Sequence, residues 1–182
     1  MADEDRITIT HWAILIGINF YMGDEGLQGS VRDVQMVKKY LEAATIPVDI
    51  AVLTATTPSD PRSQHPVESP DLWPTVENVI AKLQSILGKA NPGYFVYIHY
   101  SGHGTRRKGS DHQPRDLALV LFDDTHSCSY LIGEVLAGCL RNIVAKELLV
   151  TVVLDCYYSG RVLRVDNVQG VGIRAIEYMA FD

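Results

Sequence analysis

A histidine between two glycines is the first residue whose setting suggests chemistry. His103 lies between Gly102 and Gly104, directly after a run of aromatic and β-branched residues. Glycines on both sides allow a sharp turn and leave an imidazole uncovered, which favours a functional histidine. The alternative is a simple turn histidine, because histidine tolerates unusual backbone conformations. His99, inside the preceding run, is interpreted instead as a core residue.

A cysteine at the end of a later apolar run is the candidate partner of this imidazole. Cys156 follows Asp155 there. A thiol becomes a nucleophile only where a nearby base or cation holds it as thiolate. Cys128 and Cys139 have no comparable setting and are interpreted as packed thiols. Three cysteines are an odd number, and they lack metal-ligand spacing, which predicts a reducing, cytoplasmic location.

Strands and helices that alternate along the chain must position these residues. Short apolar runs predict buried strands, and apolar residues at helical spacing predict helices. Ser30 is expected to cap the first helix, and Gly88 with Pro92 to stop the second. The expected strands are 12–18, 49–53, 94–100, 117–122 and 148–154, and the expected helices are 30–43, 75–87 and 133–146.

This alternation predicts an α/β fold, with a mainly parallel sheet and helices on both faces. Ligands of such open sheets bind at the carboxyl ends of the strands. Segments 101–104 and 155–160 each follow a strand, so we expect the two to meet at this edge. Residues 54–74 are rich in Pro, Ser, Asp and Thr and predict a long loop that is functional or mobile.

Charge and hydropathy exclude two classes of partner. The chain has 182 residues and a formal net charge of −6, and its longest basic cluster is only 106–108. Such a chain is not expected to bind nucleic acid, which usually requires a clustered basic face. No apolar run has the roughly 18 residues of a membrane helix, and the acidic start is not typical of a secretory signal.

Three segments resemble motifs of metacaspases and fungal caspase-domain proteins. Tyr-Ser-Gly-His-Gly-Thr at 100–105 and Leu-Asp-Cys-Tyr-Tyr-Ser-Gly at 154–160 are similar to their two catalytic motifs. Leu-Gln-Gly-Ser-Val-Arg-Asp at 27–33 is similar to their Leu-x-Gly-Cys-x-Asn-Asp. The separation of His103 and Cys156, about 50 residues, also matches caspases. This resemblance predicts an N-terminal tail at 1–10, a caspase-like domain at 11–165 and a poorly defined segment at 166–182.

The resemblance implies a caspase-haemoglobinase fold of three layers and a cysteine endopeptidase mechanism. A histidine like His103 would assist a thiolate that attacks a peptide carbonyl, with backbone donors near Gly104 stabilising the oxyanion. Acidic residues matching Asp33 and Asp155 would line a pocket for the Arg or Lys of a peptide or protein substrate. By spacing alone, Asp33 is equally a first-turn acid that interacts with the helix dipole.

The chain departs from this family at the nucleophile. The family keeps its catalytic cysteine three residues before the glycine of the motif, and here that position is Tyr157. A phenol titrates near ~10 and its ring is bulky, so Tyr157 is a poor nucleophile. Cys156 is the preceding residue and should face away from His103, as a packed thiol. The domain is therefore either a peptidase with Cys156 as an unorthodox nucleophile, or a non-catalytic pseudo-caspase that binds or regulates.

Further expectations concern the C-terminus and a metal. Caspase folds continue past the nucleophile, whereas few residues follow Gly160, so the chain resembles the large-subunit portion with its C-terminal part short or missing. An incomplete sheet would leave an exposed edge that favours self-association. Calcium is implied by the resemblance, with Asp116, Asp123 and Asp124 as candidate ligands, although such loop acids are usually just solvated. A third candidate function, a small-molecule hydrolase on a flavodoxin-like sheet, is remote. The chain has neither a Gly-rich phosphate loop nor a nucleophile elbow.

Overall fold

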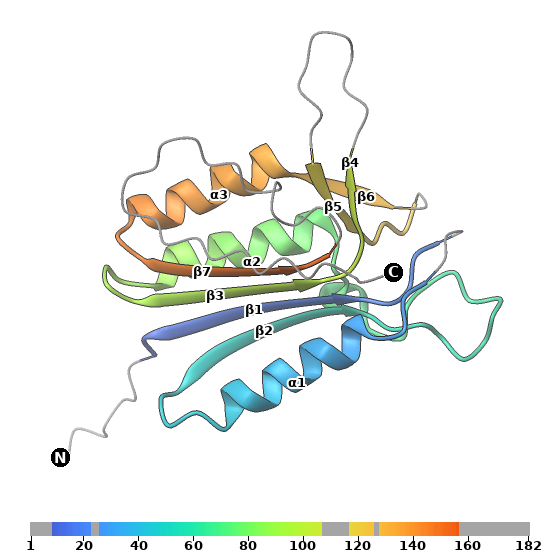
Figure 1. Cartoon of the computed structure of the whole chain (residues 1–182), viewed down its shortest axis with the longest axis horizontal. Coiled ribbons are helices and arrows are strands. Elements are labelled where there is room, and N and C mark those ends of the chain that lie inside the picture. The colour runs from blue at the N-terminus through green and yellow to red at the C-terminus, as the bar shows by residue number, and fades with distance from the viewer. Residues whose placement is uncertain (1–8, 23–25, 107–116, 126–127, 157–182) are drawn as a thin grey trace, which may run out of the picture.

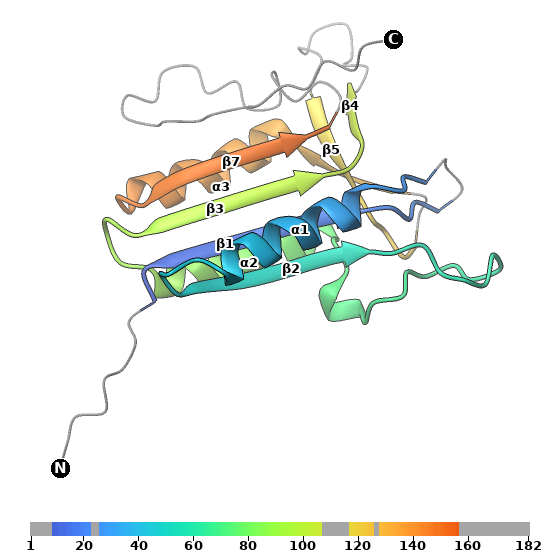
Figure 2. The ribbon, with the colours of Figure 1, turned by 60° about the horizontal axis from the view of Figure 1, so that its bottom comes forward.

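The computed structural model of the chain describes residues 9–22, 26–106, 117–125 and 128–156. Its centre is a parallel sheet of four strands in the order β2-β1-β3-β7. These strands are β1 (His11–Ile18), β2 (Val48–Ala55), β3 (Phe95–Ser101) and β7 (Leu149–Asp155). Figures 1 and 2 show helix α1 on one face of the sheet and helices α2 and α3 on the other. The predicted α/β fold with three layers is confirmed.

Apolar residues on both faces of the sheet explain this arrangement. The central strand β1 is buried from Trp12 to Ile18, as expected for a strand covered by helices on both sides. The larger apolar cluster fills the side of α2 (Val76–Lys89) and α3 (Gly133–Ala145). A smaller cluster lies under α1 (Ser30–Glu42) and includes Leu15 and Val34.

A second, antiparallel sheet continues from the end of β3. It consists of β4 (Gly104–Arg106), β5 (Leu117–Leu121) and β6 (Ser129–Ile132), in that order. Of these strands the sequence predicted only β5. The other two are short, and β4 begins inside the glycine-flanked motif that was interpreted as a loop. Their pairing with β5 is non-local, and three or four residues show too little alternation to reveal it.

Two predicted helix boundaries are wrong. Ser30 does not cap α1, because it is the first helical residue, Gly29 takes the cap position and no side chain there accepts a hydrogen bond. Gly88 does not stop α2, which continues to Lys89. A single glycine costs a helix only about 1 kcal/mol relative to alanine, so it weakens a helix more often than it ends one. Thr75, predicted as the first residue of this helix, takes the cap position of α2 and accepts from the N–H of Asn78.

The loop between β2 and α2 is largely irregular, as predicted, apart from one short 3-10 turn, η1 (Pro70–Leu72). Glu68 organises its start, since its carboxylate accepts from both the backbone N–H and the hydroxyl of Thr56. Trp73 closes the other end by donating its indole N–H to the carbonyl of Glu68. Within the described residues, no helix is both long enough and apolar enough to cross a membrane.

Candidate functional site

The two motif segments meet at the carboxyl ends of neighbouring strands. Strand β3 pairs in parallel with β7, and the register places Ser101 opposite Asp155. The N–H of Gly102 donates to the carbonyl of Asp155 at 3.2 Å, so the contact continues past the strand ends. The loop that carries His103 therefore begins beside the segment that carries Cys156. This juxtaposition, which the sequence predicted, is confirmed.

The backbone of His103 is held on both sides. Its N–H donates to the hydroxyl of Tyr21 at 2.8 Å, and its carbonyl accepts from the hydroxyl of Tyr100 at 2.7 Å and from the N–H of Val120 at 2.9 Å. The rings of Tyr21 and His103 lie 4.7 Å apart between centroids. The imidazole itself is only partly buried. Such a fixed backbone with an accessible ring suits a residue that meets a ligand.

Two buried tyrosines form the support under this loop. The hydroxyl of Tyr100 donates to the carbonyl of Val120 at 2.8 Å as well as to that of His103. Burial raises the pKa of Tyr21 to about 12 and the pKa of Tyr100 well above its ordinary value, so both remain neutral phenols. Gly102 passes close to them, because a β-carbon there would lie 2.6 Å from the Tyr100 hydroxyl. Tyr21 was missed, and only its place soon after β1 hinted at this edge.

Cys156 lies in an environment that keeps its thiol protonated. The side chain is partly buried and packs against the larger apolar cluster. Burial, with a further contribution from the negative charge of Asp155, raises the pKa of Cys156 to about 12. The thiol is also close enough to affect the pKa of Tyr21, whose ring contacts that of His103. Tyr157 lies outside the described residues.

Acidic and hydroxyl groups gather on the opposite face of the sheet, the face covered by α1. The Ser101 hydroxyl lies 3.5 Å from the carboxylate of Asp155. Asp33 stands in the first turn of α1, and both carboxylates act on the buried imidazole of His99. The predicted pair Asp33 and Asp155 thus shares one neighbour. His99 is buried, as its place inside a strand predicted, but it adjoins this acidic pair.

The start of α1 is fixed against the end of β1, which brings Asp33 to this edge. The side-chain oxygen of Asn19 accepts from the N–H of Val31 at 3.2 Å and satisfies one of the free donors of the helix start. Gly17 allows the close approach, because a β-carbon there would lie 2.8 Å from the carbonyl oxygen of Ser30. Asn19 therefore provides the interaction that the sequence assigned to Ser30.

The remaining predicted site residues have varied settings. Gly104 opens β4 and pairs with Leu119. Asp123 uses its carboxylate within its own loop, where it accepts from Thr125 and from the hydroxyl of Ser129. Asp124 is exposed, and Asp116 lies outside the described residues. Across the described ranges, no three His, Cys, Asp or Glu side chains are grouped as a metal site requires.

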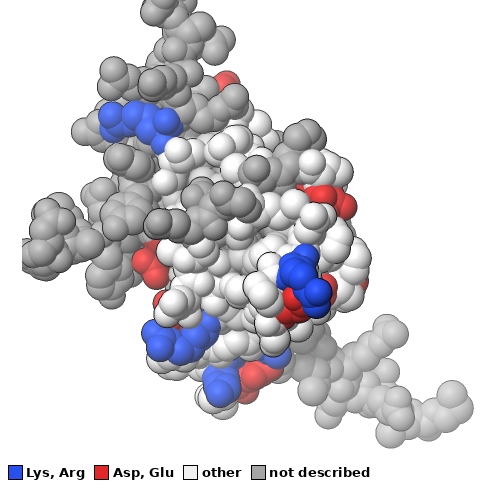
Figure 3. Space-filling view, turned by 90° about the vertical axis from the view of Figure 1, so that its right-hand side faces the viewer, with Lys and Arg blue, Asp and Glu red and all other residues white. Residues whose placement is uncertain are grey.

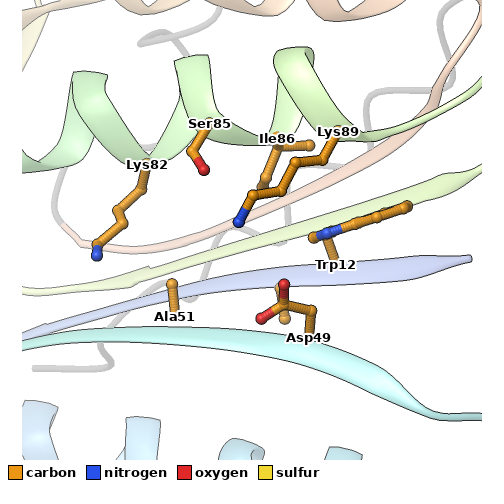
Figure 4. A pocket seen from close by; sticks show the side chains of 8 residues that line it. Trp12, Asp49, Ala51, Lys82, Ser85, Ile86 and Lys89 are labelled. Carbon is orange, nitrogen blue, oxygen red and sulfur yellow. The ribbon is translucent and has the colours of Figure 1, made fainter. Parts of the chain in front are cut away.

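Figure 3 looks at this carboxyl edge of the sheet. Where described residues form the surface, basic and acidic side chains alternate in small groups, without one large patch of a single sign. A small pocket of about 120 Å³ lies elsewhere, between α2 and the amino-terminal half of β1. Lys89 from α2 and Asp49 from β2 extend toward the same space beside Trp12 (Figure 4). Because it involves the other end of β1, this pocket is separate from the candidate site.

Comparison with known proteins agrees with this geometry. A family model described as "Metacaspase, peptidase C14 domain" matches residues 11–166. Metacaspase-3 of Trypanosoma cruzi is 31% identical over 160 residues, which cover 87% of this chain and 42% of that protein. Metacaspase-1 of Candida glabrata is 29% identical over 155 residues, covering 83% of this chain and 37% of that protein. The chain thus spans about two fifths of the length of these curated relatives.

A solved structure supports the architecture alone. The crystal structure of a Geobacter sulfurreducens protein matches with a TM-score of 0.59 at 19% identity, and the match covers 80% of this chain and 50% of that chain. The parallel four-stranded sheet, the pairing of β3 with β7 and the family match over most of the chain lead to one conclusion. The chain has a caspase-like fold and belongs to the metacaspase, peptidase C14 domain family of cysteine peptidases.

Proposed function

We propose that this domain binds peptide or protein segments through an arginine or lysine side chain held by Asp33 and Asp155. We further propose that its own peptidase activity is absent or strongly impaired, because Tyr157 occupies the position of the family's nucleophile. The family makes protein and peptide substrates the natural ligands. The domain would then act as a binding or regulatory module on a metacaspase scaffold.

The parallel pairing of β3 with β7 is the observation that carries the binding part of this proposal. It sets Asp155 beside Ser101 on the face where α1 presents Asp33. Two carboxylates and a hydroxyl offer several acceptors to the N–H groups of a guanidinium or ammonium ion. Asp33 is 40% exposed at its side chain, and its ion pair with the exposed Arg32, at 3.7 Å, is a weak surface contact that a ligand can replace.

The state of Cys156 supports the second part. Nucleophilic attack requires the thiolate, and catalytic cysteines usually have a lowered pKa in an electropositive environment. Burial and Asp155 act in the opposite direction here and raise the pKa of Cys156 to about 12. A thiol of this kind is packed and unreactive at neutral pH. The alternative is an active peptidase with Cys156 as nucleophile. It requires substrate binding to lower the pKa of Cys156.

A peptidase assay separates the two alternatives. The full chain is incubated with a fluorogenic peptide that ends in arginine, with and without calcium, and so are its variants His103→Ala, Cys156→Ala and Tyr157→Cys. We expect no cleavage by the unmodified chain and cleavage by Tyr157→Cys that disappears when His103→Ala is added. Cleavage by the unmodified chain that Cys156→Ala abolishes, while Cys139→Ala leaves it intact, would establish Cys156 as the nucleophile.

Calcium and self-association remain predictions attached to this proposal. A rate for Tyr157→Cys that rises with calcium and falls with a chelator would support a metal site completed by residues outside the described ranges. In the described sheet β7 is an edge strand, with β3 as its partner. Unpaired strand edges favour association. Sedimentation of the full chain at several concentrations should therefore reveal dimers, and a monomer at every concentration would contradict the prediction.

A further inference from the structure

His99 is a buried imidazole with one unexplained ring nitrogen. Its side chain is 8% exposed, and its Nδ1 lies 3.2 Å from the hydroxyl of Tyr97. Its Nε2 is buried and has no hydrogen-bond partner among the described residues. Nearly all buried polar atoms in proteins are paired, so an orphan of this kind requires a reason. The two nitrogens of an imidazole point in divergent directions, so Nε2 faces away from Tyr97.

The residues beside His99 on the two neighbouring strands are apolar. Residues two apart on a strand share a face, so Tyr97, His99 and Ser101 follow one another along the α1 face of β3. In the register of the sheet, His99 lies between Leu15 of β1 and Val153 of β7, which carry no charge. No cation is contributed by these neighbouring strand positions.

The charges that act on His99 are those of the acidic pair. Burial, the larger effect, lowers the pKa of His99, while the carboxylates of Asp155 on β7 and Asp33 on α1 raise it. Among the described residues, the only ion pair of either carboxylate in the acidic pair is that of Asp33 with the exposed side chain of Arg32. His99 is therefore neutral at neutral pH, and its protonation would place a positive charge within electrostatic reach of both carboxylates.

We propose that His99 forms the floor of the cation-binding pocket and competes, when protonated, with the basic side chain of the ligand for Asp155 and Asp33. This inference rests on the proposed function, because it assigns His99 to the pocket in which these carboxylates hold arginine or lysine. The neutral imidazole leaves both carboxylates to the ligand. The imidazolium places a positive charge under them, so a second cation is held less tightly. Competition is reciprocal: the ligand must also disfavour protonation of His99.

The pH range between 7.5 and 5.5 isolates this effect. Aspartate side chains have an ordinary pKa near ~3.9 and stay ionised there, whereas histidine titrates in this range. His11 provides the matched control, and His103, which belongs to the candidate site, is the competing titratable group that the experiment must exclude. His11 lies on the same face of the sheet, at the opposite end of the strands, and stacks on Phe95. His103 lies at the same edge of the sheet, in the motif loop.

Binding of Nα-acetylarginine amide to the full chain tests the proposal, with the citrulline analogue as the uncharged ligand of the same shape. Isothermal titration at pH 7.5, 6.5 and 5.5 is applied to the unmodified chain and to His99→Gln, His11→Gln, His103→Gln and Asp155→Asn. We expect the Kd of the unmodified chain to rise at least about threefold from pH 7.5 to 5.5. For His99→Gln the change should stay below about 1.5-fold, while His11→Gln and His103→Gln keep the full dependence.

The outcomes separate a failure of the proposed function from a failure of the role proposed for His99. If arginine amide does not bind at pH 7.5, or binds equally well to Asp155→Asn, the proposed function fails and this inference with it. If binding depends on Asp155 but His99→Gln keeps the pH dependence, or His103→Gln loses it, this inference alone is overturned.

A measurement on the unmodified chain covers the case in which His99→Gln does not fold. The His99 imidazole is titrated by NMR with and without saturating arginine amide. Its pKa should fall by about one unit when the ligand is bound, because two cations share the same carboxylates. An unchanged pKa of His99 overturns the inference.

Discussion

Replacing Gly102 by alanine tests whether the two buried tyrosines hold the histidine loop. A β-carbon at this position would lie 2.6 Å from the hydroxyl of Tyr100 and 2.8 Å from that of Tyr21, which is closer than real β-carbons come. To restore an ordinary contact of 3.4 Å, the Tyr100 hydroxyl has to move by roughly 0.8 Å. The hydroxyl is tied at 2.7 Å and 2.8 Å to the carbonyls of His103 and Val120, so it cannot move without breaking these bonds.

The expected cost follows from those contacts. Loss of the bifurcated hydrogen bond from the single Tyr100 O–H costs about 1–2 kcal/mol, and overpacking costs about 1–3 kcal/mol. Alanine returns about 0.5 kcal/mol by restricting the unfolded chain. Gly102→Ala should therefore lower the free energy of unfolding by about 3 kcal/mol. For a domain of this size that corresponds to a fall in Tm of about 6–12 °C.

Urea unfolding followed by circular dichroism provides the assay, with Gly88→Ala as the matched control. Gly88 lies in α2 with nothing within 4 Å of its added β-carbon, so this variant should be more stable by about 1 kcal/mol. Adding Tyr100→Phe removes the closest contact atom, and Gly102→Ala should cost less in that background. A Gly102→Ala variant within about 0.5 kcal/mol of the unmodified chain would refute the reasoning.

Four further measurements follow from the structure. Tyr21→Phe leaves the N–H of His103 without its partner and should lower stability by about 1–3 kcal/mol in urea unfolding; an unchanged midpoint would contradict this role. Thr75→Ala removes the α2 cap and should cost about 1 kcal/mol, whereas the exposed Ser85→Ala should cost nothing measurable. Cys156 should react with iodoacetamide at pH 8 more slowly than Cys128 in peptide mapping, because its pKa is raised to about 12; equal rates would contradict its burial. The pKa of His99 is lower in the folded than in the unfolded chain, so stability should fall as pH drops below about 6.5, and His99→Gln should lose that part of the slope.

The parallel sheet could be predicted from the sequence because its strands are continuous apolar runs separated by amphipathic helices. The same logic placed the motif segments at neighbouring strand ends, and β3 and β7 pair there. Strands β4 and β6 could not be predicted, since they are short and depend on distant pairing with β5. Asn19 escaped notice for a related reason: it caps α1 from outside the helix, twelve residues before its partner Val31.

At Gly102 the structure favours glycine for a different reason from the one that the sequence suggested. The sequence interpretation assigned its glycine to a sharp turn, but the only glycine with positive φ in the described ranges is Gly93. Position 102 requires glycine because the hydroxyls of Tyr21 and Tyr100 leave no room there for a side chain. Neither tyrosine belongs to a pattern that reveals such a contact, because Tyr21 lies about 80 residues earlier in the chain.

The two faces of the β7 end separate the proposed binding residues from Cys156. Asp155 faces the side of Ser101 and His99, whereas Cys156 packs into the larger apolar cluster. The pocket thus draws on one face and on α1, while the thiol contributes to the core on the other. Because Asp155 and Cys156 point to opposite faces of the sheet, a replaced nucleophile would not by itself remove the proposed acidic pocket. Retained binding of a basic ligand, without cleavage, is the behaviour that this division favours.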